Sequence, residues 1–147
     1  MNQGVVTTAF IFCVALVGCE TDPGPSPFFP LDAPAVWSEV RTCRNSIEHP
    51  GMNVRVFAEG ATKQAYLGKV YPFALGATLV KAEYADSHCA EFVQFTAMRK
   101  VSIAAAAAGG GWAWQTVKGG QVVPNATACI GCHVSSCADK DSTCVEF

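Results

Sequence analysis

The chain has 147 residues, of which 50% are hydrophobic and 15% are charged, a composition that indicates one packed globular domain and excludes a disordered tail. Ten basic and twelve acidic side chains give a formal net charge of -2, and no basic cluster stands out, so no nucleic acid partner is expected. The eight cysteines indicate an oxidising compartment unless every one of them binds a metal.

The N-terminus carries an apolar run from Val5 to Val17, which has the length of a signal peptide. It is shorter than the roughly 18 residues of a spanning helix. The run ends in Leu-Val-Gly-Cys, which resembles a bacterial lipobox, although no Lys or Arg precedes it. We therefore expect a lipoprotein signal peptide at 1–18 and lipid attachment at Cys19, on the periplasmic side or the cell surface. A buried apolar helix with an incidental cysteine is the alternative.

Proline-rich sequence follows, since residues 21–36 hold five of the eight prolines and can form neither a long helix nor a central strand. We interpret residues 19–34 as a lipid-anchored tether and residues 35–147 as the folded domain. Most of the tether is expected to be a solvated linker. Phe28 and Phe29 could dock on the domain or on the membrane surface.

The remaining sequence alternates between helical and strand patterns. Apolar residues at helical spacing predict a short amphipathic helix within residues 33–46, and residues 61–69 also favour a helix. Four segments favour strands, the first by its alternation and the other three by their β-branched and aromatic residues. They are residues 53–58, 77–84, 91–100 and 111–118. The predicted fold is α+β, mainly an antiparallel β-sheet with short flanking helices.

One motif near the C-terminus carries specific chemistry. Cys129-Ile130-Gly131-Cys132-His133 fits C-x-x-C-H, the attachment sequence of c-type haem. Two thiols at this spacing can add to the vinyl groups of one porphyrin, and the histidine can reach its iron. We therefore expect haem to be bound at a C-terminal C-x-x-C-H turn. A thioredoxin-like redox pair would need a βαβ setting, and a zinc site would need a second ligand pair. The two cysteines could also be further disulfide partners.

No methionine follows the motif, because Met52 and Met98 both precede it. Simple electron transfer would need Met98 as a second axial ligand, which would give a low-spin spectrum. Trp112 and Trp114 share one strand face, with core packing as the default and contact with the haem edge as the alternative.

Four segments together resemble the cytochrome P-460 family, which includes cytochrome c-prime-beta. They are YPFALGATLVKAEY, FTAMRK, GGGWAWQTV and the terminal CIGCH, and the resemblance covers about residue 53 to the C-terminus. It implies a periplasmic, largely antiparallel β domain that is often dimeric. It also implies one five-coordinate haem whose distal side is open to hydroxylamine or nitric oxide.

Carried over to this sequence, the resemblance assigns the thioether bonds to Cys129 and Cys132 and the proximal iron ligand to His133. Lys81 stands where P-460 members place the lysine that cross-links to the haem edge. An ordinary solvated edge position, with or without a salt bridge, is an equal interpretation of Lys81 from the sequence.

The sequence departs from the family at the distal carboxylate, the plausible proton acceptor of hydroxylamine oxidation. Phe95 or Thr96 stands near its place, and the closest acid, Glu91, comes too early. This predicts an apolar distal wall, suited to binding a gas, and leaves hydroxylamine or nitric oxide oxidoreductase activity weak and uncertain.

Four cysteines remain, and an even number in an exported domain favours two disulfides. Three pairings are possible, of which we favour Cys43 with Cys89 and Cys137 with Cys144. His49 and His88 lie in polar, loop-like settings and are interpreted as surface histidines.

These features predict a c-type mono-haem protein of the cell envelope that binds nitric oxide or a related small nitrogen compound, passes electrons, or does both. Its expected partners are that ligand, a redox protein, the membrane through its lipid and a second copy in a homodimer. The alternative is a haem-free, disulfide-stabilised surface lipoprotein that acts as an interaction module.

Overall fold

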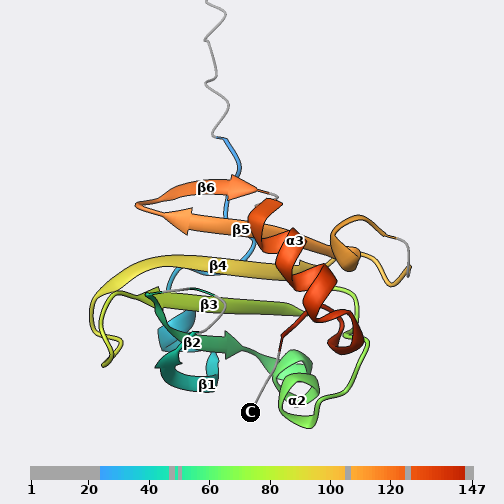
Figure 1. Cartoon of the computed structure of the whole chain (residues 1–147), viewed down its shortest axis with the longest axis horizontal. Helices are drawn as coiled ribbons and strands as arrows, with labels where there is room; N and C mark the ends of the chain where they lie inside the picture. Colours follow the sequence, from blue (N-terminus) through green and yellow to red (C-terminus); the bar gives the residue numbers. More distant parts are fainter. Residues whose placement is uncertain (1–23, 47–48, 50, 105–106, 125–126, 145–147) are drawn as a thin grey trace, which may run out of the picture.

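The computed structural model describes residues 24–46, 49, 51–104, 107–124 and 127–144. Its centre is one six-stranded sheet whose spatial order follows the chain, with every neighbouring pair antiparallel (Figure 1). The strands are β1 (Ser38–Asn45), β2 (Asn53–Ala58), β3 (Thr78–Tyr84), β4 (Phe92–Lys100), β5 (Trp112–Lys118) and β6 (Gln121–Pro124). The predicted α+β class with a mainly antiparallel sheet is confirmed.

Short helices flank the sheet. They are α1 (Ala33–Val36), α2 (Gly60–Gly68) and α3 (Thr127–Ser136), with 3₁₀ turns η1 (Ala108–Gly111) and η2 (Ala138–Lys140). In Figure 1, α3 crosses in front of the strands, and the segment that leads into α1 runs behind them. None of the helices in the described part of the chain is long and apolar enough to cross a membrane.

The predicted helix within residues 33–46 is wrong beyond its first turn. Only Ala33–Val36 is helical, and Ser38–Asn45 forms β1, which pairs with β2 from Ser38 opposite Ala58 to Asn45 opposite Asn53. The apolar spacing fits a helix locally, but strand pairing with a distant segment satisfies the backbone of both strands and decides the outcome. β6 is a second difference, because its four residues were not predicted as a strand.

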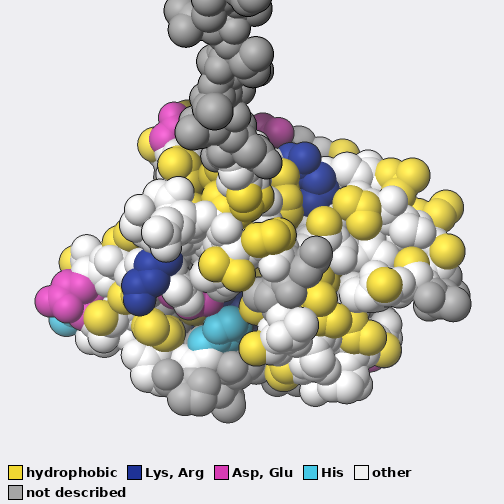
Figure 2. Space-filling view, turned by 90° about the horizontal axis from the view of Figure 1, so that it is seen from above, with side chains coloured by type: hydrophobic (Ala, Val, Ile, Leu, Met, Phe, Trp, Pro, Cys, Tyr) yellow, Lys and Arg dark blue, Asp and Glu magenta, His cyan; other side chains and the backbone are white. Residues whose placement is uncertain are grey.

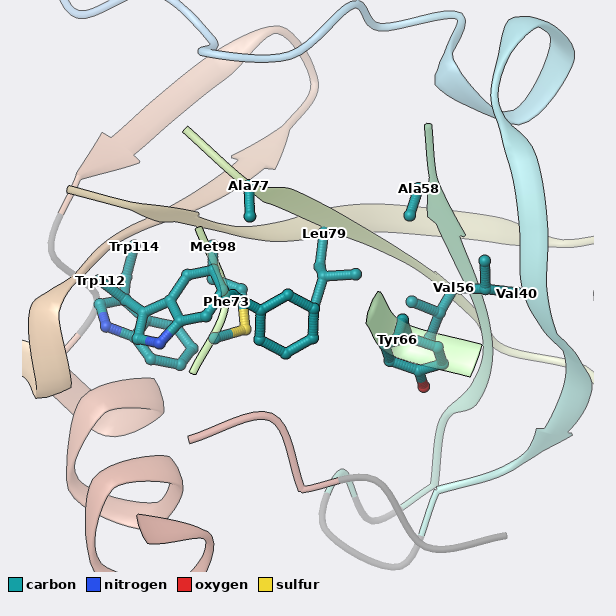
Figure 3. Packing of buried hydrophobic residues seen from close by; sticks show 10 residues of the cluster. All are labelled: Val40, Val56, Ala58, Tyr66, Phe73, Ala77, Leu79, Met98, Trp112 and Trp114. Atoms are coloured by element: carbon teal, nitrogen blue, oxygen red, sulfur yellow. The ribbon is translucent and has the colours of Figure 1, made fainter. Parts of the chain in front are cut away.

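Both faces of the sheet are covered by hydrophobic side chains. Figure 3 shows one cluster on the side of the sheet on which α3 lies, formed mainly by side chains of the strands together with Tyr66 from α2 and Phe73 from the loop after it. It contains Val40, Val56, Ala58, Tyr66, Phe73, Ala77, Leu79, Met98, Trp112 and Trp114. Core packing of both tryptophans is confirmed.

The opposite face is covered by the N-terminal segment. Phe29 and Ala33 are buried in a cluster with Phe95, and the side-chain amide of Gln115 accepts a hydrogen bond from the Phe28 N–H at 3.0 Å. The same amide donates to the Ser26 carbonyl at 3.1 Å. Docking of the two phenylalanines on the domain, one of the alternatives left open, is therefore observed, and this part of the predicted tether lies on the sheet.

Two disulfides staple the fold, Cys43–Cys89 and Cys137–Cys144. This is the predicted pairing, and it is confirmed. The first joins β1 to the loop after β3, and the second closes the segment that follows α3. The predicted signal peptide, Cys19 and the first tether residues lie outside the described residues.

The surface carries few charged side chains, as expected from a chain in which 15% of the residues are charged. On the face shown in Figure 2, hydrophobic side chains are scattered among uncharged polar ones, and the few Lys and Arg side chains stand apart. The exposed large hydrophobic residues include Leu31, Val36, Phe92 and Ile103, which come from different parts of the chain.

Candidate functional site

The C-x-x-C-H motif lies on a regular helix, α3, rather than on the turn expected from the sequence. On a helix, residues three and four apart share a face, so Cys129 lies next to both Cys132 and His133. His133 is buried, Cys129 is half-buried and Cys132 is exposed. Neither cysteine forms a disulfide. All three side chains border the space between α3 and the sheet.

This space consists of two adjoining hollows that share Cys129, His133, His49 and Thr96 as lining residues. The first contains about 600 Å³ of space between atoms, part of it open to solvent. The room that this hollow offers to a ligand is much smaller, about 50 Å³, and the second hollow offers about 310 Å³. Its apolar lining comes mainly from the sheet, from Val56, Leu79, Met98 and Trp114.

His133 is held in a defined orientation. Its Nδ1 lies 2.8 Å from the backbone carbonyl oxygen of Ser142, and its ring meets Trp114 edge-on with ring centres 4.8 Å apart. A carbonyl only accepts, so Nδ1 carries the proton and Nε2 carries the lone pair of the neutral ring. This is the tautomer that a metal-binding histidine adopts when its second nitrogen donates to a backbone carbonyl.

A chain of polar groups lies on the sheet side of the space. The Lys81 Nζ lies 2.8 Å from Nε2 of His49, and His49 Nδ1 lies 3.2 Å from a carboxylate oxygen of Glu83. An ammonium only donates, so His49 accepts at Nε2 and donates from Nδ1 to Glu83. Glu83 also accepts hydrogen bonds from the Gln94 amide at 2.7 Å and the Thr96 hydroxyl at 3.0 Å.

The charge state of Glu83 follows from these contacts. Its side chain is only 2% exposed, and burial by itself would raise its pKa. The hydrogen bonds that it accepts from His49, Gln94 and Thr96 outweigh burial and hold the pKa of Glu83 below its ordinary value. The site therefore contains a buried carboxylate that is ionised at neutral pH.

Two expectations about this region are wrong, and a third holds only in part. Lys81 does not occupy an edge position, because β3 is a central strand and Lys81 pairs with Val56 on one side and Thr96 on the other. His49 is not a solvated surface histidine but lines both hollows. The lining is apolar only in part, because the carboxylate of Glu83 on β3 borders the second hollow.

Of the two residues expected near the distal position, only Thr96 borders the space. Phe95 points to the other face, where its ring packs against Phe29 with ring centres 5.6 Å apart. Glu83 was missed. The sequence did contain a signal for it, because Glu83 is two residues after Lys81 and residues two apart on a strand lie on the same face of the sheet.

Three further observations concern the other interpretations of the motif and of the cysteines. Burial, followed by the negative charge of Glu83, raises the pKa of the Cys129 thiol. Redox-active cysteine pairs instead depend on a lowered thiol pKa. Within the described ranges, no group of three or more His, Cys, Asp or Glu is placed to hold a metal ion. His88 and its neighbour Cys89 could bind a metal together only if the Cys89 thiol were free, and Cys89 is in a disulfide.

Comparison with known proteins adds no family to this description: no protein-family model, curated protein or solved structure matches the chain.

Proposed function

We propose that this chain is a c-type mono-haem protein that binds nitric oxide or a related small nitrogen compound. In this proposal Cys129 and Cys132 form the thioether bonds and His133 is the proximal iron ligand. The observation that carries it is the arrangement of α3. Its three side chains border two adjoining hollows, Cys129 and His133 also line the more apolar of the two, and His133 presents the metal-binding tautomer.

The lining of the space suits haem chemically. Leu79, Met98 and Trp114 offer an apolar surface to a porphyrin ring. Arg41 and Lys81 bring positive charge to the same hollow, which favours a ligand that carries carboxylates, as haem does. When bound, the haem would supply an iron centre able to take up a small ligand and to change its oxidation state.

The polar chain supports a ligand that exchanges protons or hydrogen bonds with the protein. Glu83 can hold a proton at its carboxylate, and His49 lies between it and Lys81. These groups would supply the acid–base function for which the sequence offered no distal carboxylate, so a weak hydroxylamine or nitric oxide oxidoreductase activity belongs to the proposal. Cross-linking of Lys81 to the haem edge is its most specific form.

The cellular setting forms a separate part of the proposal. The N-terminal sequence supports export as a lipoprotein anchored through Cys19, facing the periplasm or the cell surface. Two disulfides are the mark of an oxidising compartment and agree with export. A redox partner protein and a homodimer complete the proposal.

Spectroscopy of the full chain, produced with a haem maturation system, tests the function. We expect a high-spin ferrous spectrum that changes on addition of nitric oxide, and a colourless Cys129→Ala/Cys132→Ala control. A low-spin spectrum that Met98→Leu converts to high spin would replace ligand binding by electron transfer through Met98. Wild-type protein without haem would favour the disulfide-stabilised interaction module.

Lys81 is tested on the same material by protease digestion and mass spectrometry. A cross-link joins the peptide that holds Lys81 to the haem peptide that holds Cys129 and Cys132. Separate peptides would limit Lys81 to its contact with His49.

A further inference from the structure

The acceptor of the His133 hydrogen bond is a backbone atom in the segment that follows α3. We call residues Cys137–Cys144 the C-terminal loop. The Ser142 carbonyl of this loop lies 2.8 Å from His133 Nδ1, and the bond is buried. A backbone carbonyl cannot be replaced by mutation, so its position depends entirely on what holds the loop.

The loop is closed on itself and on α3. The Ser142 N–H donates to the Cys137 carbonyl at 2.8 Å, and the Cys137 N–H donates to the His133 carbonyl at 3.1 Å. The Cys137–Cys144 disulfide joins the two ends of the loop across seven residues. Ser142 therefore lies inside a small covalent ring that begins one turn after His133.

The backbone of the loop is unusual. Asp141, Ser142 and Cys144 have positive φ values of 50°, 63° and 43°, a region that non-glycine residues avoid. Such conformations persist only where the surroundings over-determine them, and they cluster at functional sites. The disulfide is one constraint that can hold this conformation.

Asp141 is the second constraint. Its carboxylate forms an ion pair with Lys100 and accepts a hydrogen bond from the Phe73 N–H at 2.9 Å. Its backbone carbonyl accepts a hydrogen bond from the Trp112 indole at 2.8 Å. Both side chains of the ion pair are largely buried, at 3% exposure for Lys100 and 12% for Asp141. The loop is thereby fixed to the sheet at the residue before Ser142.

We propose that the Cys137–Cys144 disulfide and Asp141 are positioning groups that hold the Ser142 carbonyl on His133 and so set the strength of His133 as an iron ligand. The inference rests on the proposed haem function. A partner that accepts the second ring N–H of a ligating histidine raises the basicity of that ligand. Hydrogen bonding around the iron ligands is also one of the means by which a protein sets a haem potential.

The test compares two disulfide deletions in the full haem-loaded chain. In Cys137→Ser/Cys144→Ser, we expect the iron–histidine stretching frequency of the ferrous protein to fall and the haem midpoint potential to become more positive. The control is Cys43→Ser/Cys89→Ser. It removes a disulfide that spans 46 residues and packs on the opposite face of the sheet, so both values should stay at those of the wild type.

Asp141→Asn provides a second perturbation, which leaves the disulfide in place. Asparagine tolerates positive φ, so the backbone of the loop is kept while the charge that pairs with Lys100 is lost. We expect shifts in the same direction as for the disulfide deletion, but smaller. Equal values in the wild type, the Cys137→Ser/Cys144→Ser variant and Asp141→Asn would overturn the inference.

A haem-free measurement separates this inference from the proposed function. In the Cys129→Ala/Cys132→Ala chain, ¹⁵N NMR should show His133 protonated at Nδ1, and deletion of the Cys137–Cys144 disulfide should give a mixture of tautomers. An unchanged tautomer would contradict the positioning role. Absence of haem from the wild-type chain would instead contradict the proposed function and leave the NMR result as the measure of the loop.

Discussion

Replacement of Glu83 by glutamine tests the polar chain at its buried end. The carboxylate accepts three hydrogen bonds and its side chain is 2% exposed. Hydrogen bonds to charged groups contribute about 1.5–3 kcal/mol each, and glutamine keeps one acceptor oxygen while it places an NH₂ group against a donor. We expect Glu83→Gln to lose about 2–4 kcal/mol of unfolding free energy at pH 7.

The loss should depend on pH in a defined direction. The folded pKa of Glu83 is lower than the ordinary value of 4.5, so the unfolded chain takes up the proton first as the pH falls. The contribution of this carboxylate to the unfolding free energy is complete above its unfolded pKa. It declines as the pH falls from there through the folded pKa. The stability difference between wild type and Glu83→Gln should therefore narrow at acid pH.

Urea unfolding between pH 7 and pH 3 measures both effects, with Glu59→Gln as the control for loss of an exposed carboxylate. The control should differ from the wild type by less than about 0.5 kcal/mol throughout. If Glu83→Gln is as stable as the wild type at pH 7, or if the difference does not change with pH, the buried ionised carboxylate is refuted.

Three further predictions concern the rest of the fold. Lys100→Met or Asp141→Asn alone should cost about 3–5 kcal/mol, whereas the double variant should cost clearly less than the sum, because no buried charge is left unpaired; additive losses in urea unfolding would contradict this. Loss of the Cys43–Cys89 disulfide, which spans 46 residues, should cost about 4 kcal/mol by loop entropy, and a loss below about 1 kcal/mol would not fit. In haem-free protein, iodoacetamide should modify the exposed Cys132 faster than Cys129, whose pKa is raised by burial; peptide mass spectrometry at short reaction times would show the reverse order if the burial is wrong.

The sheet could be predicted where local sequence agrees with strand formation. β3, β4 and β5 are rich in β-branched and aromatic residues, and their bounds lie close to those predicted. β1 could not be predicted in this way, because Val36, Trp37 and Val40 fit a helical spacing. Only pairing with β2 makes the segment a strand. Propensity is local, whereas strand pairing is a tertiary property.

The candidate site divides in the same way. Cys129, Cys132 and His133 are neighbours in the sequence, so their spacing alone indicates shared chemistry. His49 and Glu83 are distant in the chain, and nothing in a single sequence signals that a loop histidine reaches a buried carboxylate. The acceptor for His133 is a backbone oxygen and leaves no mark in the sequence at all.

The intact mass of the mature protein, purified after expression with a haem maturation system, tests the central claim most directly. The account predicts a mass increased by one haem, retained after denaturation and reduction, with Cys129 and Cys132 both resistant to alkylation. A colourless protein of unmodified mass, with these two cysteines alkylated or joined to each other, would contradict it.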